Sequence, residues 1–118
     1  MTKIETPKEL VDKILQAVEV ARNTGKVRKG TNETTKAIEG GDAQLVVIAN
    51  DVEPAEIVMH LPALCNEKKI PYVYVPSKVE LGRAGGIDVG AAAISIADAG
   101  EGKEQLKEIL RNIEKIAK

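Results

Sequence analysis

The residue types best suited to chemistry are concentrated in one short segment, Gly30 to Lys36. Thr31 is placed to cap a helix there, and the free backbone N–H groups of a helix N-terminus attract phosphate. Asn32 and Lys36 are four residues apart and share one helix face, with Glu33 beside Lys36. Together they offer donors and acceptors that can read the edges of base pairs. Glu33 argues against a plain phosphate site, because its carboxylate would repel the ligand.

A simpler interpretation of this segment is an ordinary helical turn, in which Glu33 favours the helix dipole and pairs with Lys36. The local charge favours binding instead. Residues 22–36 hold five basic side chains and one acidic one, a sum of +4, while the whole chain has a net charge of −1. The rest of the chain therefore sums to −5, so the basic segment would attract an anion to one face, unless it is merely a solvated turn.

A second candidate segment is rich in glycine and spans residues 81–90. It lacks the Gly-Lys-Ser/Thr of a Walker motif and the glycine spacing of a dinucleotide-binding loop, so its glycines predict a tight turn. Ile87 and Val89 stand between Gly86 and Gly90 and would lie at a loop tip, where exposed apolar side chains mark contact with a partner. The alternative is that both are buried at the start of a strand.

Other chemistries find little support. One histidine and one cysteine are too few for a metal cluster or an internal disulfide, and they predict a cytoplasmic chain without a metal or cofactor. We expect His60 to be packed and Cys65 to be a small core residue, which leaves no recognisable catalytic pair. The only aromatic residues are Tyr72 and Tyr74, so a base-stacking platform is excluded. Neither a signal peptide nor a membrane-spanning segment is expected.

The elements that must position these residues alternate between helix and strand. Apolar spacing predicts a first helix capped by Thr6 and followed by Gly25, a second at about 31–40, a third from Pro54, a short one capped by Ser77, and a last one. The apolar stripe of that last helix is Leu106, Ile109, Leu110, Ile113 and Ile116. Strands are expected at 44–49, 72–75 and 91–97. The pattern predicts one domain over residues 1–118, a three-layer α/β/α sandwich around a mixed sheet of about four strands.

The chain resembles the kink-turn-binding family of ribosomal proteins, and its archaeal large-subunit members more than its eukaryotic nucleolar ones. The resemblance runs through nearly the whole chain and is carried by residues 28–36 (RKGTNETTK), 46–49 (VVIA), 51–54 (DVEP), 61–62 (LP), 64–65 (LC), 70–75 (IPYVYV), 77–78 (SK) and 81–82 (LG). Its basic-loop and glycine-loop motifs are specific when taken together. It implies a single α/β/α domain that grips a kink-turn, a helix–bulge–helix RNA with tandem sheared G·A pairs. Where eukaryotic relatives carry an arginine after the second helix, this chain has Gly40.

The resemblance also implies roles for particular residues. Asn32, Glu33 and Lys36 would read the G·A pairs through a widened major groove, and Gly30 would let the backbone approach the RNA. The loop Ile87, Asp88 and Val89 would cover the flipped bulge nucleotide. The expected RNA-binding set is Lys26, Arg28, Lys29, Gly30, Thr31, Asn32, Glu33, Lys36, Lys78, Ile87, Asp88 and Val89.

The expected partners are ribosomal RNA in the ribosome, box C/D and H/ACA guide RNAs with other guide-particle proteins, and RNase P RNA. The protein itself would be a non-catalytic monomer. Two other functions remain open from the residues alone. One is a small-molecule or nucleotide-binding α/β enzyme, which requires a deep pocket with a titratable group inside. The other is a protein-interaction module that uses Ile87 and Val89.

Overall fold

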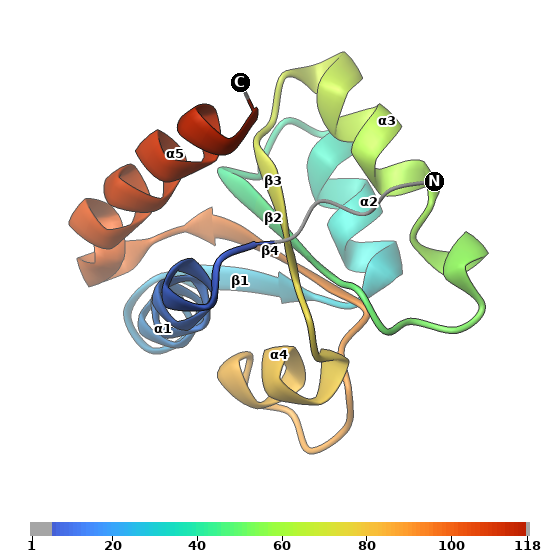
Figure 1. The fold of residues 1–118 in the computed structure, drawn as a ribbon, viewed down its shortest axis with the longest axis horizontal. Helices are drawn as coiled ribbons and strands as arrows, with labels where there is room; N and C mark the ends of the chain where they lie inside the picture. Colours follow the sequence, from blue (N-terminus) through green and yellow to red (C-terminus); the bar gives the residue numbers. More distant parts are fainter. Residues whose placement is uncertain (1–5, 118) are drawn as a thin grey trace.

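The computed structural model describes the backbone of residues 6–117 and the side chains of residues 6–114, so Ile116 of the predicted stripe lies outside the described side chains. The chain forms helices and strands in the order α1 (Lys8–Thr24), β1 (Lys26–Lys29), α2 (Thr31–Glu39), β2 (Leu45–Ala49), η1 (Ala55–Ile57), α3 (His60–Lys68), β3 (Tyr72–Val75), α4 (Lys78–Ala84), β4 (Ala93–Asp98), η2 (Gly100–Gly102) and α5 (Lys103–Ala117), as Figure 1 shows. None of these helices is both long and apolar enough to cross a membrane, within the residues described.

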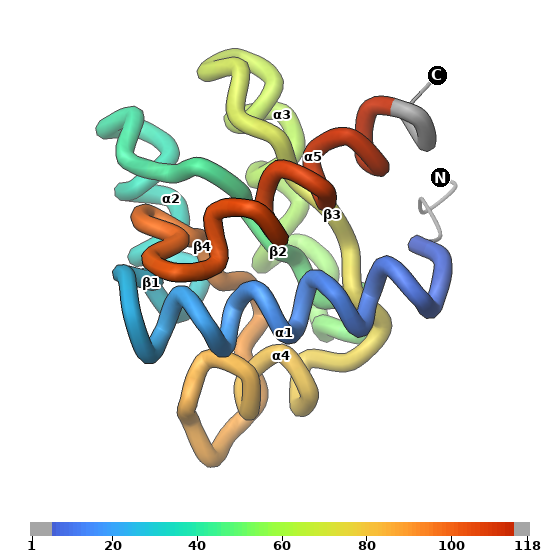
Figure 2. Tube along the Cα trace, turned by 90° about the vertical axis from the view of Figure 1, so that its left-hand side faces the viewer, coloured from blue at the N-terminus to red at the C-terminus, as the bar shows by residue number. Residues whose placement is uncertain are grey.

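The four strands form one mixed sheet in the order β1-β4-β2-β3. β4 is antiparallel to both of its neighbours, and β2 and β3 are parallel, so β1, β2 and β3 all run in the same direction. Helices α2 and α3 cover one face of the sheet, and α1, α4 and α5 cover the other (Figure 1). Figure 2 shows α1 lying between α5 and α4 in that second layer. The predicted three-layer sandwich with a four-stranded mixed sheet is confirmed.

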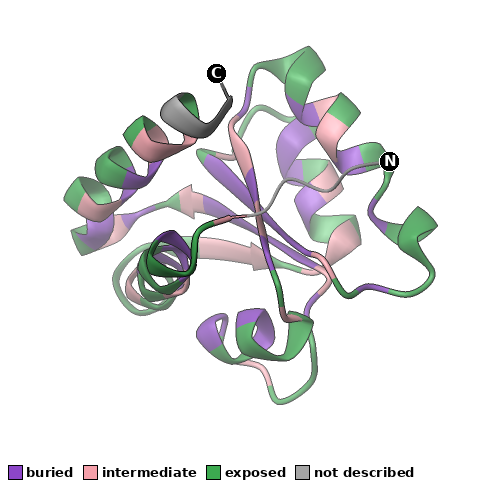
Figure 3. Cartoon of the chain, viewed as in Figure 1, coloured by how far each residue is buried: buried purple, intermediate pink, exposed green. Residues whose placement is uncertain are grey.

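The interior is almost entirely aliphatic. All five residues of β2 are buried, because this strand is central and covered on both faces (Figure 3). The largest fully buried side chains are Ile14, Ile38, Leu45, Ile48, Leu61, Leu81, Ile94, Ile96 and Ile109. Leu106 and Ile109 anchor α5 to this core. The two tyrosines lie on the edge strand β3, half-buried and edge to face, with ring centroids 6.2 Å apart.

The sequence pattern missed one strand. The basic piece Lys26–Lys29 forms β1, and its residues are exposed or half-buried. β1 lies at the edge of the sheet, and charged side chains are common on edge strands because they discourage pairing with another chain. Three of its four residues are charged and Val27 is its one apolar residue, so the sequence resembles a loop as long as its pairing with β4 is not known.

Two predicted helix caps are wrong. The hydroxyl of Thr6 donates to the carbonyl oxygen of Tyr74 at 2.6 Å, and Pro7 occupies the N-cap position of α1 without a side-chain cap. In α2 the cap position belongs to Gly30, and Thr31 is the first helical residue. The predicted cap of α4 is confirmed, because Ser77 Oγ accepts a hydrogen bond from the backbone N–H of Glu80 at 3.2 Å.

The predicted third helix is split in two. The segment after Pro54 forms only the short helix η1, and the chain bends before α3 begins at His60. The predicted helix from Pro54 puts Ile57 on one apolar face with Leu61, Leu64 and Cys65, yet the side chain of Ile57 is 42% exposed because η1 lies outside the core layer. The predicted strand 91–97 also shifts to Ala93–Asp98, since the backbone N–H of Ala91 donates to Lys78 rather than to a strand.

Candidate nucleic-acid interface

The sheet brings four segments together at one of its two edges. Here and below, these are the edges at which the strands begin and end, not the outer strands β1 and β3. β1, β2 and β3 end at this edge and β4 begins there, so the segments 29–36, 50–57, 76–79 and 85–92 lie next to one another (Figure 1). We call these four segments the rim. Hydrogen bonds within and directly beside these segments hold them together: Lys78 N–H to Asp51 Oδ1 at 2.8 Å, Ala91 N–H to Lys78 O at 2.9 Å, Asn50 N–H to Val75 O at 2.8 Å, and Gly30 N–H to Ala93 O at 2.9 Å.

The centre of the rim is the junction between β1 and α2. Gly30 has φ +95° and ψ 161°, a conformation essentially restricted to glycine, and no heavy atom lies within 4 Å of the position where its Cβ would be. This conformation turns the chain from the strand directly into the helix. The backbone is therefore open to a ligand at this point.

The predicted reading residues lie in the first turns of α2. Asn32, Glu33 and Lys36 are all exposed, as base recognition requires. Both oxygens of Glu33 face a cation: Oε1 lies 3.6 Å from Arg28 Nη1, and Oε2 lies 3.6 Å from Lys36 Nζ. The pairing of Glu33 with Lys36, which the simpler interpretation requires, is thus present together with a second partner that spacing did not reveal.

The basic residues of β1 separate into three positions. Lys29 is exposed and ends the strand at the rim, whereas Arg28 is only half-buried and faces Glu33. Lys26 begins the strand opposite Asp98, at the other edge of the sheet. Three residue steps along a strand are about 10 Å, so the structure does not bring Lys26 to the rim.

The glycine-rich loop 85–90 also lies at the rim, and its two apolar residues differ. Val89 is 72% exposed, as the contact interpretation predicts. Ile87 is half-buried against the core, but it does not start a strand, since β4 begins at Ala93; its backbone N–H donates to Gly82 O at 2.9 Å. Asp88 between them is exposed. The loop packs so closely on α4 that a Cβ on Gly82 would overlap the carbonyl oxygen of Val89.

Lys78 and Val79 connect this loop with the end of β3. The side chain of Lys78 is exposed, and its Cγ lies 2.9 Å from the position of a Cβ on Gly90, so its stem runs beside the loop. Val79, the next residue, is 45% exposed and is a second exposed apolar side chain of the rim. The predicted cation and the predicted apolar contact therefore belong to one surface.

Sequence reasoning missed the segment that follows β2. Asn50 to Glu56 line a hollow of about 610 Å³ on the rim, and Ile57 beyond it is exposed. The available signal was its position, because loops that follow the carboxyl ends of parallel strands commonly form binding sites. Reading 54–65 as one helix concealed this loop.

His60 and Cys65 complete the comparison with the sequence. His60 was expected to be packed, but it begins α3 and is exposed. The Thr35 hydroxyl donates to Thr31 O at 2.8 Å, so it accepts from His60 Nε2, also at 2.8 Å. Cys65 is fully buried, and burial raises the pKa of its thiol to about 11, which confirms a core role. Among the described residues, there is no group of three or more His, Cys, Asp or Glu side chains that could hold a metal ion.

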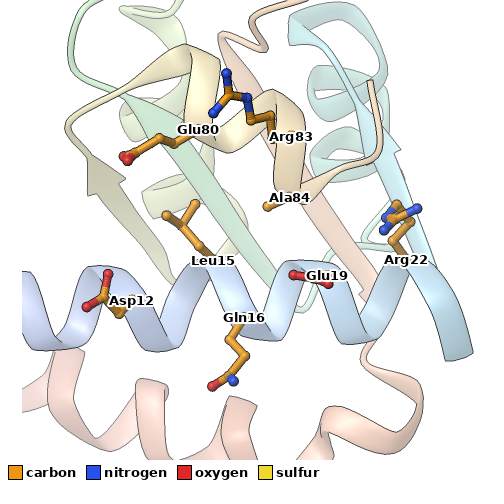
Figure 4. Close-up of a pocket in the computed structure, with 8 residues that line it drawn as sticks. All are labelled: Asp12, Leu15, Gln16, Glu19, Arg22, Glu80, Arg83 and Ala84. Atoms are coloured by element: carbon orange, nitrogen blue, oxygen red, sulfur yellow. The ribbon is translucent and has the colours of Figure 1, made fainter. Parts of the chain in front are cut away.

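A second surface hollow lies between α1 and α4, with a volume of about 470 Å³ (Figure 4). Leu15 and Ala84 form its apolar part. Its charged residues are all exposed: Asp12, Glu19, Arg22, Glu80 and Arg83. The enzyme alternative requires a titratable group enclosed in a pocket, and this open groove does not provide one.

Comparisons with other proteins identify the family and support the fold. The model of the ribosomal protein L7Ae/L30e/S12e/Gadd45 family matches residues 12–106. The chain belongs to this family. Among solved structures it is similar to the Giardia lamblia 15.5kD RNA binding protein, with 35% sequence identity and a TM-score of 0.89 over 94% of this chain and 92% of that one. The family match includes all four segments of the rim.

Proposed function

We propose that this member of the family is a non-catalytic, cytoplasmic RNA-binding protein that recognises and stabilises kink-turn motifs. The observation that supports the proposal is that β1 ends and β4 begins at one edge of the sheet, where Gly30 N–H donates to Ala93 O, so the start of α2 and the glycine-rich loop that leads into β4 share this edge. A polar reading surface and an apolar tip therefore face one ligand. The similar 15.5kD protein from Giardia lamblia, an RNA binding protein, supports RNA as that ligand.

The charge distribution suits a small, specific RNA contact. The net charge of −1 cannot hold a long duplex, whereas Lys29, Lys36 and Lys78 supply exposed cations at the rim. With about three phosphates engaged, the logarithm of affinity should fall with the logarithm of salt concentration at a slope of roughly −2 to −3. These cations attract the RNA, whereas its identity must be read through contacts to its bases.

Asn32, Glu33 and Lys36 supply the contacts that can identify bases. A regular A-form helix hides its major groove, but a bulge opens it and exposes unstacked bases. The sheared G·A pairs of a kink-turn present amino and imino N–H groups, and a carboxylate accepts hydrogen bonds from such groups. A phosphate group has no such donors. Val89 is placed to cover a base that has left the stack. Binding one bent conformer preferentially shifts the RNA population towards it.

The proposed RNAs are ribosomal RNA, box C/D and H/ACA guide RNAs and RNase P RNA, in an archaeal setting where one protein serves several particles. The proposal has a direct test. Calorimetric titrations compare a bulged RNA that carries tandem G·A pairs with a fully paired duplex of the same length.

The wild-type protein should prefer the bulged RNA, and Asn32→Ala should lose about 1–3 kcal/mol of that binding. Asn66→Ala is the matched control, because Asn66 is exposed near the end of α3, away from the rim. Equal affinity of the wild-type protein for both RNAs would refute the proposal. A salt slope near −8 would indicate nonspecific charge binding instead.

A further inference from the structure

Arg28 lies just before the rim and differs from the basic residues of the rim in how it is held. It lies within β1, in register with Ser95 of β4, and its side chain is 31% exposed, compared with 73% for Lys36. Its Nε atom is buried and has no hydrogen-bond partner. A guanidinium held in this way is not extended into solvent, where a phosphate group would meet it.

The side chain of Arg28 lies beneath α2. Ile94 faces the opposite layer, because its Cδ1 lies 2.6 Å from the position of a Cβ on Gly85, next to α4. Neighbouring side chains on a strand alternate between faces, so Ser95 points towards α2, and its register partner Arg28 does so too. The ion pair between Arg28 and Glu33 of α2 agrees with this direction.

The surroundings of Arg28 are polar although they are buried. Ser95 Oγ and Thr34 Oγ1 are fully buried, and neither has a hydrogen-bond partner. Thr34 directly follows Glu33 in α2, and Ser95 pairs with Arg28. Buried polar groups without partners reduce stability, and an ion pair at 3.6 Å with a half-exposed carboxylate returns little of that loss. Stability therefore does not explain why an arginine occupies this position.

The two cations that face Glu33 are suited to different tasks. Lys36 is on the helix surface, and its flexible stem can turn towards an incoming RNA. Arg28 comes from the strand below and is fixed by packing, so it stays with Oε1 when Lys36 leaves Oε2. The carboxylate then keeps one orientation while its second oxygen becomes available to a base.

We propose that Arg28 is a positioning residue, which orients the Glu33 carboxylate to accept hydrogen bonds from the amino or imino groups of a non-Watson–Crick-paired purine. This inference rests on the proposed function. It also assigns Arg28 a different role from Lys29 and Lys78, because Arg28 determines which RNA is bound rather than how strongly any RNA is attracted.

The test uses two bulged RNAs of identical length and charge, one with tandem G·A pairs and one with Watson–Crick pairs in their place. The affinity ratio between them is measured at several salt concentrations for the wild-type protein, Arg28→Met, Glu33→Gln and the double variant. Methionine keeps most of the aliphatic stem and removes the guanidinium. Arg111→Met is the matched control, since Arg111 is exposed on α5.

Arg28→Met should reduce the affinity ratio by roughly tenfold, within the range for one good base contact, and leave the salt slope unchanged. The double variant should discriminate no less well than Glu33→Gln alone, because both changes remove the same contact. Arg111→Met should match the wild-type protein.

A phosphate-binding role for Arg28 gives the opposite pattern and would overturn the inference. Affinity for both RNAs would fall equally, and the slope would lose about 0.7–0.9. Additive effects in the double variant would overturn it as well. If circular dichroism shows that Arg28→Met is unfolded, the same cycle with Arg28→Lys decides by the same additivity criterion. A wild-type protein that distinguishes bulged RNA from duplex, but not these two RNAs, would overturn the inference and leave RNA binding standing.

Discussion

β1 has a glycine at each end, and the two glycines are needed for opposite reasons. Gly25 precedes the strand with φ −132° and ψ −130°, and a Cβ there would overlap the carbonyl oxygen of Asp98 and lie 2.7 Å from Gly100 N. Gly30 follows the strand with φ +95° and open space beside it. One glycine allows two backbones to pack closely. The other allows a turn and leaves the backbone accessible.

The same contrast extends to the two edges of the sheet. At the Gly25 edge, Thr24 Oγ1 accepts a hydrogen bond from Glu101 N–H at 2.9 Å, and Asp98 Oδ1 accepts one from Gly100 N–H at 2.9 Å. At this edge, these polar groups therefore form hydrogen bonds within the chain. The rim instead has open space beside Gly30 and exposes the side chains of Asn32, Glu33 and Val89. The fold is closed by packing at one edge and left open for a partner at the other.

The largest loss of stability should come from adding a side chain at Gly25, where the edge is closed by packing. Gly25→Ala forces a Cβ against the backbone of Asp98 and Gly100, so the free energy of unfolding should fall by about 3 kcal/mol or more. Urea denaturation measures it. Gly40→Ala is the control, because its nearest contacts at 3.4 Å are ordinary and its φ is −83°. Equal stability of the two variants would show that the Gly25 edge is not closed by packing.

The dependence of stability on pH reports on the core, where Cys65 is buried, rather than on either edge of the sheet. The raised pKa of Cys65 means that folding favours the protonated thiol, so its contribution is complete below about pH 9 and is lost as the pH rises towards 11. Two pH units correspond to about 2.7 kcal/mol. Urea denaturation at pH 7, 9 and 10.5 should show this decline in the wild-type protein and a smaller one in Cys65→Ala.

Some decline should persist in the Cys65→Ala variant. Burial also raises the pKa of Tyr74, assisted by the neighbouring Tyr72 and Cys65, and this acts in the same direction at higher pH. A wild-type stability that stays constant through pH 10.5 would contradict the buried position of the thiol.

The smallest change in stability is expected at the rim. Gly30→Ala meets no atom but strains the backbone, which should cost about 2 kcal/mol of folding free energy. Gly41→Ala is a close match, since Gly41 has φ +72° and equally open surroundings at the other end of α2. Both variants should lose similar stability by urea denaturation, while only Gly30→Ala should weaken binding of the bulged RNA. Equal RNA affinity of the two would remove Gly30 from the interface.

The sequence predicted the layers of the fold because periodicity reports burial. The continuous run of β2 and the apolar stripe of α5 depend on local patterns that survive without knowledge of neighbours. β1 could not be recognised in that way. Its residues are polar because it is an edge strand, and only pairing with β4 defines it. The bend between η1 and α3 likewise depends on how the chain leaves the core after β2.

The residues of the candidate site divide in the same way, into those that local patterns predict and those that only tertiary contacts reveal. The glycine, amide, carboxylate and ammonium of 30–36 could be selected from residue types and spacing alone, because helix geometry fixes neighbours three and four apart. The relation of Arg28 to Glu33 could not, since a strand residue meets a helix residue only after the chain has turned at Gly30. The same limit explains why Lys26 was grouped with Lys29 although they lie at opposite ends of β1.

The sequence by itself determined which groups this protein can present: a polar helix start, an apolar loop residue and an aliphatic core with few aromatic residues. Only the tertiary structure decided which of them share a surface. The deciding factor is strand direction, because three strands that end and one that begins at the same edge bring together segments separated by up to about sixty residues. No local pattern encodes that direction, which arises from long-range pairing of backbone groups.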